Sequence, residues 1–120
     1  MENAWIEHKG KKILVNDYTG IKLEKEMIAH LNGAVGMVAS LAPGSEVLML
    51  LDFTGTFTTP GYIEAARKTE KETIEKFKVK RAVLGITGAK EILLKGFNLL
   101  AKQKLTPFHT REEALDYLTK

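Results

Sequence analysis

The clearest pattern in the chain is a run of five apolar residues, Val47 to Leu51, which leads into Asp52 and a loop with four threonines. A short apolar run that ends in turn residues is typical of a strand buried on both faces, as in a parallel sheet. We therefore predict a strand over residues 46–53. In open α/β sheets, ligands and partners are bound beyond the carboxyl ends of such strands. The loop after Asp52 is thus the predicted working surface.

The N-terminal segment predicts a hairpin. Residues 4–9 and 12–18 have the pattern of two antiparallel strands joined at Gly10-Lys11, with one face in water. Glycine at the turn permits the positive φ that a tight hairpin needs. The expected core positions of this pair are Trp5, Ile13 and Val15.

Between the hairpin and the apolar strand, hydrophobic residues recur at helical spacing. They predict an amphipathic helix over residues 21–42, ended by Pro43-Gly44. Gly33 and Gly36 lie inside it, and each costs about 1 kcal/mol relative to alanine. Close packing against the sheet is the simplest explanation for them. The residues of the apolar stripe are Leu23, Met27, Leu31, Val35, Val38 and Ala42.

A second helix is predicted to begin after the threonine loop. Thr59 is a suitable N-cap, and Pro60 suits the first helical position. Residues 81–87 then form a second buried strand, so that strand, helix and strand make one right-handed parallel βαβ unit. The positions expected to line the inner side of the helical segment are Ile63, Ala66, Ile74 and Phe77.

The last third of the chain predicts a helix, a short edge segment and a closing helix. The first helix spans about 89–103, and residues 105–108 are extended, with Pro107 confining them to a sheet edge or a loop. The closing helix begins with a capping box formed by Thr110 and Glu113. The inward positions expected for the helix over 89–103 are Ile92, Leu93, Gly96, Leu99 and Leu100.

Together these elements predict an α/β fold. A mixed four- to five-stranded sheet has an N-terminal antiparallel hairpin, a βαβ unit and covering helices, and 120 residues form a single domain over 1–120. With 44% hydrophobic and 28% charged residues, the composition is that of an ordinary globular protein. We expect a cytoplasmic protein, because the chain has neither an apolar stretch of membrane length nor a signal-peptide core.

Charge and motif patterns exclude several classes of function. The net charge of +3 is spread over lysines mixed with glutamates, which indicates solvated helix faces rather than a nucleic-acid surface. The chain has no cysteine, and its three histidines show no ligand spacing, so no metal site is expected. Thr87-Gly88-Ala89-Lys90 lacks the spacing of a phosphate-binding loop, and we expect no cofactor.

Four strings carry a resemblance to a known family: HKGKKILVNDYTG at 8–20, VLMLLDFTGTF at 47–57, RAVLGITGAKEILL at 81–94 and TREEALDYL at 110–118. With the order of elements, they resemble the SpoIIAA-like branch of the STAS domains, often grouped with the lipid-binding CRAL-TRIO fold. In that family, anti-sigma antagonists carry Asp-Ser-Ser-Gly after the central strand, and the second serine is a regulatory phosphoacceptor. The matching residues are Asp52-Phe53-Thr54-Gly55, so the resemblance implies that Thr54 is the equivalent hydroxyl. Phe53 and Thr54 both depart from the serines of the motif.

The candidate surface for a partner or ligand is therefore the loop and the start of the next helix. A phosphate on Thr54 would add nearly two negative charges there. The competing interpretation, which the pattern favours, is that the threonines only cap backbone groups. Asp52 is likewise expected to cap loop amides. The full set of candidate residues is Asp52, Thr54, Gly55, Thr56, Thr58, Thr59 and Gly88.

Three functions remain open from the sequence. The leading one is a non-catalytic protein-interaction or regulatory module. The second is a carrier of a small apolar or lipid-like ligand, with a pocket lined by the helix over 21–42. The third is an enzyme whose site the sequence does not reveal. Self-association through an exposed edge strand of the hairpin is also open.

Overall fold

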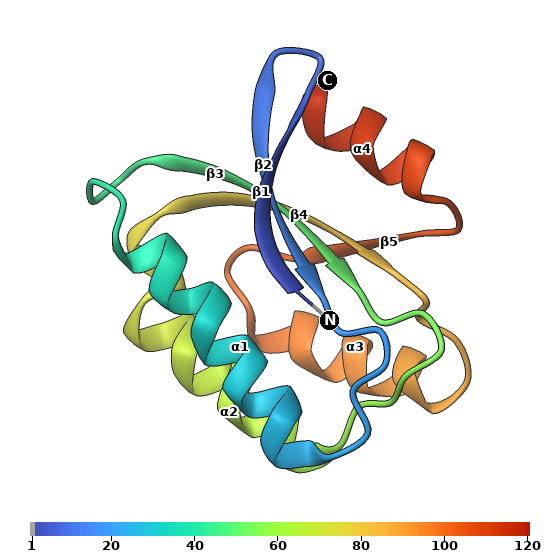
Figure 1. Cartoon of the computed structure of the whole chain (residues 1–120). Coiled ribbons are helices and arrows are strands. Elements are labelled where there is room, and N and C mark those ends of the chain that lie inside the picture. Colours follow the sequence, from blue (N-terminus) through green and yellow to red (C-terminus); the bar gives the residue numbers. More distant parts are fainter. Residues whose placement is uncertain (1) are drawn as a thin grey trace.

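The computed structural model describes residues 2–120 and has the predicted order of elements (Figure 1). A five-stranded sheet is covered on one side by three helices and on the other by the C-terminal helix. The elements in chain order are β1 (Glu2–His8), β2 (Lys11–Asp17), α1 (Glu24–Ala39), β3 (Glu46–Asp52), α2 (Pro60–Glu72), the 3₁₀ turn η1 (Ile74–Lys76), β4 (Lys78–Leu84), α3 (Ala89–Leu100), β5 (Leu105–Phe108) and α4 (Arg111–Thr119).

The strands lie side by side in chain order, β1-β2-β3-β4-β5. β1 is antiparallel to β2, and the other three pairings are parallel. The predicted mixed sheet and hairpin are therefore confirmed. Because β2, β3 and β4 point the same way, their carboxyl ends meet at one edge of the sheet, next to the threonine loop.

The sheet separates two apolar cores. Alternate strand residues point towards α1, α2 and α3, and the residues between them point towards α4. β3 contributes to both cores and is buried on both faces, as its apolar run predicts. The helix-covered side includes Leu14, Val47, Met49, Leu51 and Val83, and the α4 side includes Ile13, Val15, Leu50, Ala82 and Leu84.

The predicted starts of α2 and α4 at their threonine caps are confirmed. The Thr59 hydroxyl accepts a hydrogen bond from the Tyr62 amide, and Pro60 is the first residue of α2. Pro107 lies in the edge strand β5. The capping box is only half as expected. Thr110 accepts from the Glu113 amide, but the Glu113 carboxylate accepts from the Thr110 hydroxyl and not from a backbone amide.

Three predicted elements have different boundaries in the structure: the helices α1 and α3 are shorter than predicted, and the strand β4 is displaced. α1 begins at Glu24 and ends at Ala39, inside the predicted 21–42, and α3 stops at Leu100. β4 occupies Lys78–Leu84 rather than 81–87. It ends there because Gly85 has φ +77°, which an extended strand does not adopt.

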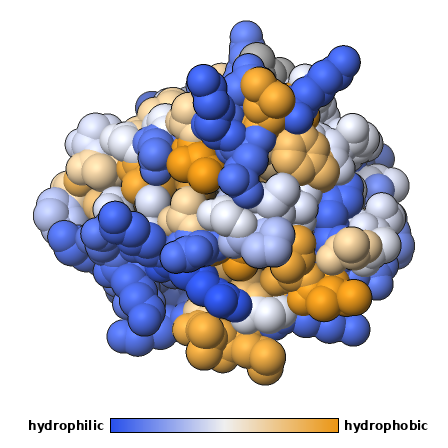
Figure 2. Space-filling model, turned by 90° about the horizontal axis from the view of Figure 1, so that it is seen from below, coloured by the Kyte–Doolittle hydropathy of each residue, from blue (hydrophilic) through white to orange (hydrophobic). Residues whose placement is uncertain are grey.

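The predicted inner face of α3 was wrong at Ile92, Leu99 and Leu100, whereas the predicted Leu93 and Gly96 are half-buried. Leu94 and Phe97 are the buried residues of this helix, whereas Ile92, Leu99 and Leu100 are 74%, 83% and 67% exposed. The sequence of α3 is apolar on several sides, so its periodicity does not single out one inner face. Figure 2 shows the surface from below, where hydrophobic side chains interrupt a largely hydrophilic surface.

Trp5 was also misassigned to the core. It is 38% exposed, while Ile13 and Val15 of the neighbouring strand are buried as predicted. The reason is position, because β1 is the edge of the sheet and pairs with β2 alone. An edge strand is covered less completely than a central one.

Leu94→Ala and Leu99→Ala test the assignment of the α3 face with the same chemical change. We expect Leu94→Ala to lower the free energy of unfolding by about 2–5 kcal/mol, because it removes a buried side chain. Leu99→Ala should change it by no more than about 0.5 kcal/mol. Urea unfolding of the two variants measures both values. Equal losses would mean that Leu99 is packed as well.

Candidate functional site

The loop between β3 and α2 is fixed at its first turn by the end of the strand. Asp52 Oδ1 accepts a hydrogen bond of 2.9 Å from the Thr54 amide. The expected capping role of Asp52 is therefore confirmed. Phe53 points inward and is 4% exposed, and its amide donates to the Leu84 carbonyl of β4 at 2.9 Å. Thr54 lies directly beyond this anchor and is exposed.

Lys90 of α3 binds the same turn from the side. Its Nζ donates to the carbonyl oxygens of Phe53 and Thr56, each at 3.1 Å. Gly88 is exposed at the start of α3, two residues before this lysine. The segment that fails as a phosphate-binding loop thus has a different task, which is to hold the backbone of the neighbouring loop. The sequence analysis did not find this role for Lys90.

Two other threonines of the loop, Thr56 and Thr59, form side-chain hydrogen bonds, whereas Thr58 Oγ1 has no partner among residues 2–120. Thr56 Oγ1 donates to the Ile21 carbonyl at 2.9 Å, and the Thr59 hydroxyl donates to the Glu24 carboxylate. These contacts tie the loop to the segment before α1 and to the first turn of α1. The capping interpretation therefore holds for Thr56 and Thr59. Thr54 differs, because no side-chain hydrogen bond of its hydroxyl is seen within residues 2–120.

Two glycines shape this turn. Gly55 has φ +69°, a left-handed conformation that follows the exposed Thr54. Gly85, directly after β4, packs so closely that a Cβ there would lie 2.4 Å from the Thr54 amide nitrogen. Only a residue without a side chain fits at this contact. The loop is thus held by Asp52, Lys90, Thr56 and a close backbone contact, and it presents the Thr54 hydroxyl to solvent.

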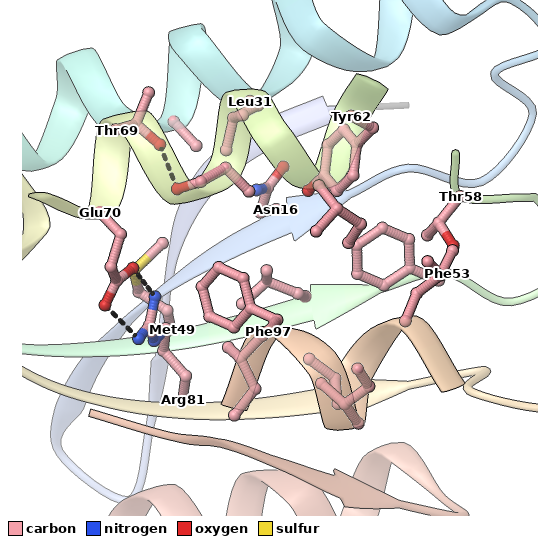
Figure 3. A pocket seen from close by; sticks show the side chains of 18 of the residues that line it. Asn16, Leu31, Met49, Phe53, Thr58, Tyr62, Thr69, Glu70, Arg81 and Phe97 are labelled. Atoms are coloured by element: carbon pink, nitrogen blue, oxygen red, sulfur yellow. Dashed lines mark hydrogen bonds and ion pairs between the residues drawn. The ribbon is translucent and has the colours of Figure 1, made fainter. Parts of the chain in front are cut away.

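Beneath the loop, a cavity lies between the sheet and the three covering helices. Figure 3 shows its length, from Glu70 and Arg81 at one end to Phe53 and Thr58 at the other. Its walls are mostly apolar and include Leu31, Met49, Leu51, Ile63, Leu94 and Phe97.

An ion pair is buried at one end of this cavity. Arg81 of β4 donates to the two carboxylate oxygens of Glu70 of α2 at 2.7 and 2.8 Å, and both residues are about 95% buried. Arg81 also donates to the Gln103 carbonyl. Such a two-pronged pair is strong and sets the angle between strand and helix. Both oxygens of Glu70 are engaged, which leaves neither of them poised to move a proton.

The sequence analysis missed this pair, although a signal existed. Arg81 alternates with Val79 and Val83 along β4, which places it on their face. Glu70 continues the stripe of Ile63 and Ala66 at helical spacing. An arginine in a buried strand needs an acidic partner, and the inward stripe of the preceding helix contains one.

A second set of polar side chains, Asn16, Tyr18 and Tyr62, is joined by hydrogen bonds, and Asn16 and Tyr62 line the cavity. Asn16 Nδ2 donates to the Tyr18 hydroxyl at 3.0 Å, and the Tyr62 hydroxyl donates to the same oxygen at 2.7 Å. Tyr18 stacks on Phe53 with ring centroids 4.5 Å apart. Burial raises the pKa of Tyr18 to about 12, although its hydrogen bonds oppose the shift. Burial also holds the pKa of Tyr62 well above its ordinary value. Both phenols are therefore neutral at physiological pH.

The volume of the cavity bears on the carrier hypothesis. It measures about 60 Å³, whereas small-molecule sites typically enclose about 300–1,000 Å³. Asn16 Oδ1, Thr58 Oγ1 and Arg81 Nε have no hydrogen-bond partner among residues 2–120. A few water molecules would fit this space and satisfy such atoms. In this conformation the cavity does not favour a lipid-like ligand.

Residues 2–120, the part of the chain that the structure describes, have neither a metal-binding cluster nor a membrane-spanning helix. They contain no group of three or more His, Asp or Glu side chains arranged to hold a metal ion. None of their helices has the length and apolarity needed to cross a bilayer.

Among solved structures, an uncharacterised protein of the DUF3478 family from Shewanella loihica PV-4 is similar to this chain. It is described as having a SpoIIAA-like fold, with a TM-score of 0.65 over 98% of this chain and 92% of the other. The present chain has a SpoIIAA-like fold. The two sequences are 16% identical, so the likeness concerns the fold alone. No family model matches the sequence, and no curated protein matches it.

Gly85→Ala tests the close contact that supports the loop, with Gly44→Ala as a matched control. Both glycines have a left-handed φ, +77° and +83°, so both variants pay about 1–2 kcal/mol for the backbone. Only at Gly85 would the new Cβ meet the backbone of Thr54, because nothing lies within 4 Å of the corresponding position at Gly44.

We expect Gly85→Ala to lower the free energy of unfolding by a further amount of about 1–3 kcal/mol, the usual cost of overpacking. It should also speed hydrogen exchange at the Thr54 amide. Equal stability and equal exchange in the two variants would contradict the close contact.

Glu70→Gln tests the buried ion pair. It should lower the free energy of unfolding by about 3–5 kcal/mol, because it leaves the Arg81 charge buried without its counter-charge. The double variant Glu70→Leu/Arg81→Met should recover most of this loss. For comparison, Lys102→Met removes an exposed pair with Glu75 at 3.7 Å and should cost at most about 1 kcal/mol. Urea unfolding measures all three, and a Glu70→Gln cost as small as that of Lys102→Met would show that the pair is not buried.

Proposed function

We propose that the chain is a non-catalytic, STAS-type protein-interaction module that recognises its partner through the loop over residues 52–61. The observation that carries this proposal is the contrast between a fixed backbone and a free hydroxyl. Asp52 and Lys90 hold the turn by three hydrogen bonds, while Thr54 stands exposed at its tip. A loop that is already ordered loses little conformational entropy when it binds.

The same geometry supports regulation at Thr54. A phosphate there would carry nearly two negative charges, and it would stand next to the Asp52 carboxylate that binds the Thr54 amide. Repulsion between like charges would weaken this anchor and change the surface presented to a partner. The SpoIIAA-like fold agrees with the resemblance that placed the phosphoacceptor at this position.

The enzyme hypothesis is less well supported. Catalysis by proton transfer needs a side chain within reach of a substrate and free to exchange its proton. The carboxylate in the cavity, Glu70, is engaged by Arg81, and the carboxylate at the loop, Asp52, by the Thr54 amide. These contacts support binding rather than proton-transfer catalysis as the proposed function.

Photo-crosslinking from position 54 tests the proposal in cells of the source organism. A photoreactive amino acid at Thr54 should crosslink to a distinct protein, whereas the same residue at Glu112, exposed on α4 across the sheet, should not. Thr54→Asp should abolish co-purification of that protein, and mass spectrometry would reveal a phosphate on Thr54. Thr54→Val removes the hydroxyl without adding a charge, so comparison with Thr54→Asp shows which of the two changes affects partner binding.

Thr54→Val should keep the wild-type free energy of unfolding within about 0.5 kcal/mol, because the side chain is exposed. Thr54→Asp should lower it by at most about 1 kcal/mol, because the repulsion from Asp52 acts at the exposed surface. If the partner binds Thr54→Asp, Thr54→Val and wild type equally, or crosslinks as readily from position 112, the proposed surface is wrong.

A further inference from the structure

The first strand of the sheet has an open edge. β1 pairs with β2 alone, runs for seven residues in continuous register and contains no proline, glycine or lysine. The opposite edge differs, since β5 has only four residues and includes Pro107. Natural sheets shorten, charge or interrupt their edges to prevent pairing with other chains. Here β5 is short and interrupted by a proline, whereas β1 has only the charges of Glu2 and Glu7.

The hairpin geometry determines which residues of β1 offer hydrogen bonds outward. Lys9 and Gly10 have φ +52° and +78°, as in a type I′ turn. His8 and Lys11 then form a hydrogen-bonded pair, and such pairs alternate along an antiparallel ladder. Ile6, Ala4 and Glu2 bond to β2 in the same way. Asn3, Trp5 and Glu7 consequently direct their amides and carbonyls away from the sheet.

This set of three residues is complementary to itself. If two copies of β1 pair antiparallel with Trp5 opposite Trp5, Asn3 lies opposite Glu7, and all three outward-facing positions are hydrogen-bonded on both strands. On the other face, Glu2 lies opposite His8, and Ala4 lies opposite Ile6. A carboxylate can accept a hydrogen bond from an imidazole N–H, and apolar pairs across strands are favourable.

Helix α1 leaves room for this arrangement. Three of its exposed residues, Ala29, Gly33 and Gly36, are small and recur at helical spacing. Gly33 faces β1, because a Cβ there would meet Asn3 Nδ2 at 3.0 Å, while nothing lies within 4 Å of Gly36. α1 and β1 run in the same direction, so a step from Asn3 to Trp5 corresponds to about one helical turn, from Gly33 to the region of Gly36. Gly36, at about this level, has no side chain that would obstruct a second Trp5 ring.

We propose that two copies of this chain form a symmetric dimer through antiparallel pairing of β1 with β1, centred on Trp5. The dimer has a continuous ten-stranded sheet, with the α1 helices of both copies on one face. Its symmetry points the carboxyl ends of the parallel strands in opposite directions. The two Thr54 loops therefore lie at opposite edges of the sheet, and both remain accessible.

Sedimentation of the whole chain over a dilution series tests the dimer. We expect wild type to sediment at twice the chain mass of 13.4 kDa at high concentration. Trp5→Lys should be monomeric and folded, because it places two like charges at the axis. Trp5→Tyr should remain dimeric. Glu7→Pro should also be monomeric, since it removes an outward-facing amide without breaking a bond to β2.

Leu99→Lys is the control for a dimer that forms through the exposed face of α3 instead of β1. It places a charge on the exposed face of α3 and should leave the dimer intact. A wild-type chain that stays monomeric, or a dimer that Leu99→Lys dissolves and Trp5→Lys does not, would overturn the proposal.

Cysteine crosslinking tests the register, because the natural chain contains no cysteine. A mixture of Glu2→Cys and His8→Cys chains should form a disulfide-linked dimer on oxidation, since these positions face each other across the axis. Neither variant alone should do so, because two copies of the same position lie roughly 20 Å apart along the strands. Crosslinking of either variant alone would show a different register. The result is independent of the function proposed for Thr54, because a monomeric Trp5→Lys chain keeps its loop.

Discussion

The burial of β3 on both faces is the constraint on which the structure depends. A strand with apolar side chains on both sides must lie in the middle of a sheet, and both faces of that sheet must be covered. Three helices cover one face and α4 covers the other. The same arrangement brings the parallel strands to one edge with their carboxyl ends aligned. The position of the Asp52 turn is therefore a consequence of how the core is built.

The helix-covered core contains polar groups whose cost must be offset by specific partners. Asn16 and Arg81 point from the sheet into an otherwise apolar region. Arg81 donates two hydrogen bonds to Glu70, and Asn16 Nδ2 donates one to the Tyr18 hydroxyl, which also accepts from Tyr62. A buried ion pair adds little net stability compared with apolar residues, but a structure that separates its members is strongly disfavoured. The pair therefore contributes to a single register between α2 and β4, and with it to the placement of the loop that begins α2.

The sequence predicts the elements and the loop well, for reasons that lie in particular residues. The Val47–Leu51 run predicts a buried strand, Thr59-Pro60 predicts a helix start, and Pro107 predicts a sheet edge or a loop. The structure has the buried strand β3, the start of α2 and the edge strand β5 at these places. The capping role of Asp52 follows from its place at a strand end. These features depend on local chemistry, which a single sequence contains.

What the sequence did not predict depends on neighbours distant along the chain. The inner face of α3 is set by the sheet and by Arg67, which donates to the Gly96 carbonyl. Its own apolar residues surround much of the helix. Trp5 is half exposed because no strand lies beyond β1, and apolar periodicity does not report which strand is the edge. Lys90 holds the loop through two carbonyls more than thirty residues away in sequence. Such contacts can be predicted only once the order of the strands in the sheet is known.

The edge of β1 and the loop over residues 52–61 together suggest how the fold would serve the proposed binding. The loop lies at the carboxyl ends of the parallel strands, and the free edge of β1 runs along the side of the same sheet. Pairing through that edge would use backbone groups that the monomer leaves unsatisfied, without covering any residue of the loop. Two loops at opposite ends of one rigid sheet can engage two partners, or two sites on one assembly, whose effective concentration is then set by the sheet rather than by a flexible linker. A charge added at Thr54 would weaken the binding of a partner at each loop separately. Loss of β1 pairing at Trp5 would remove the gain in affinity that comes from linking two loops.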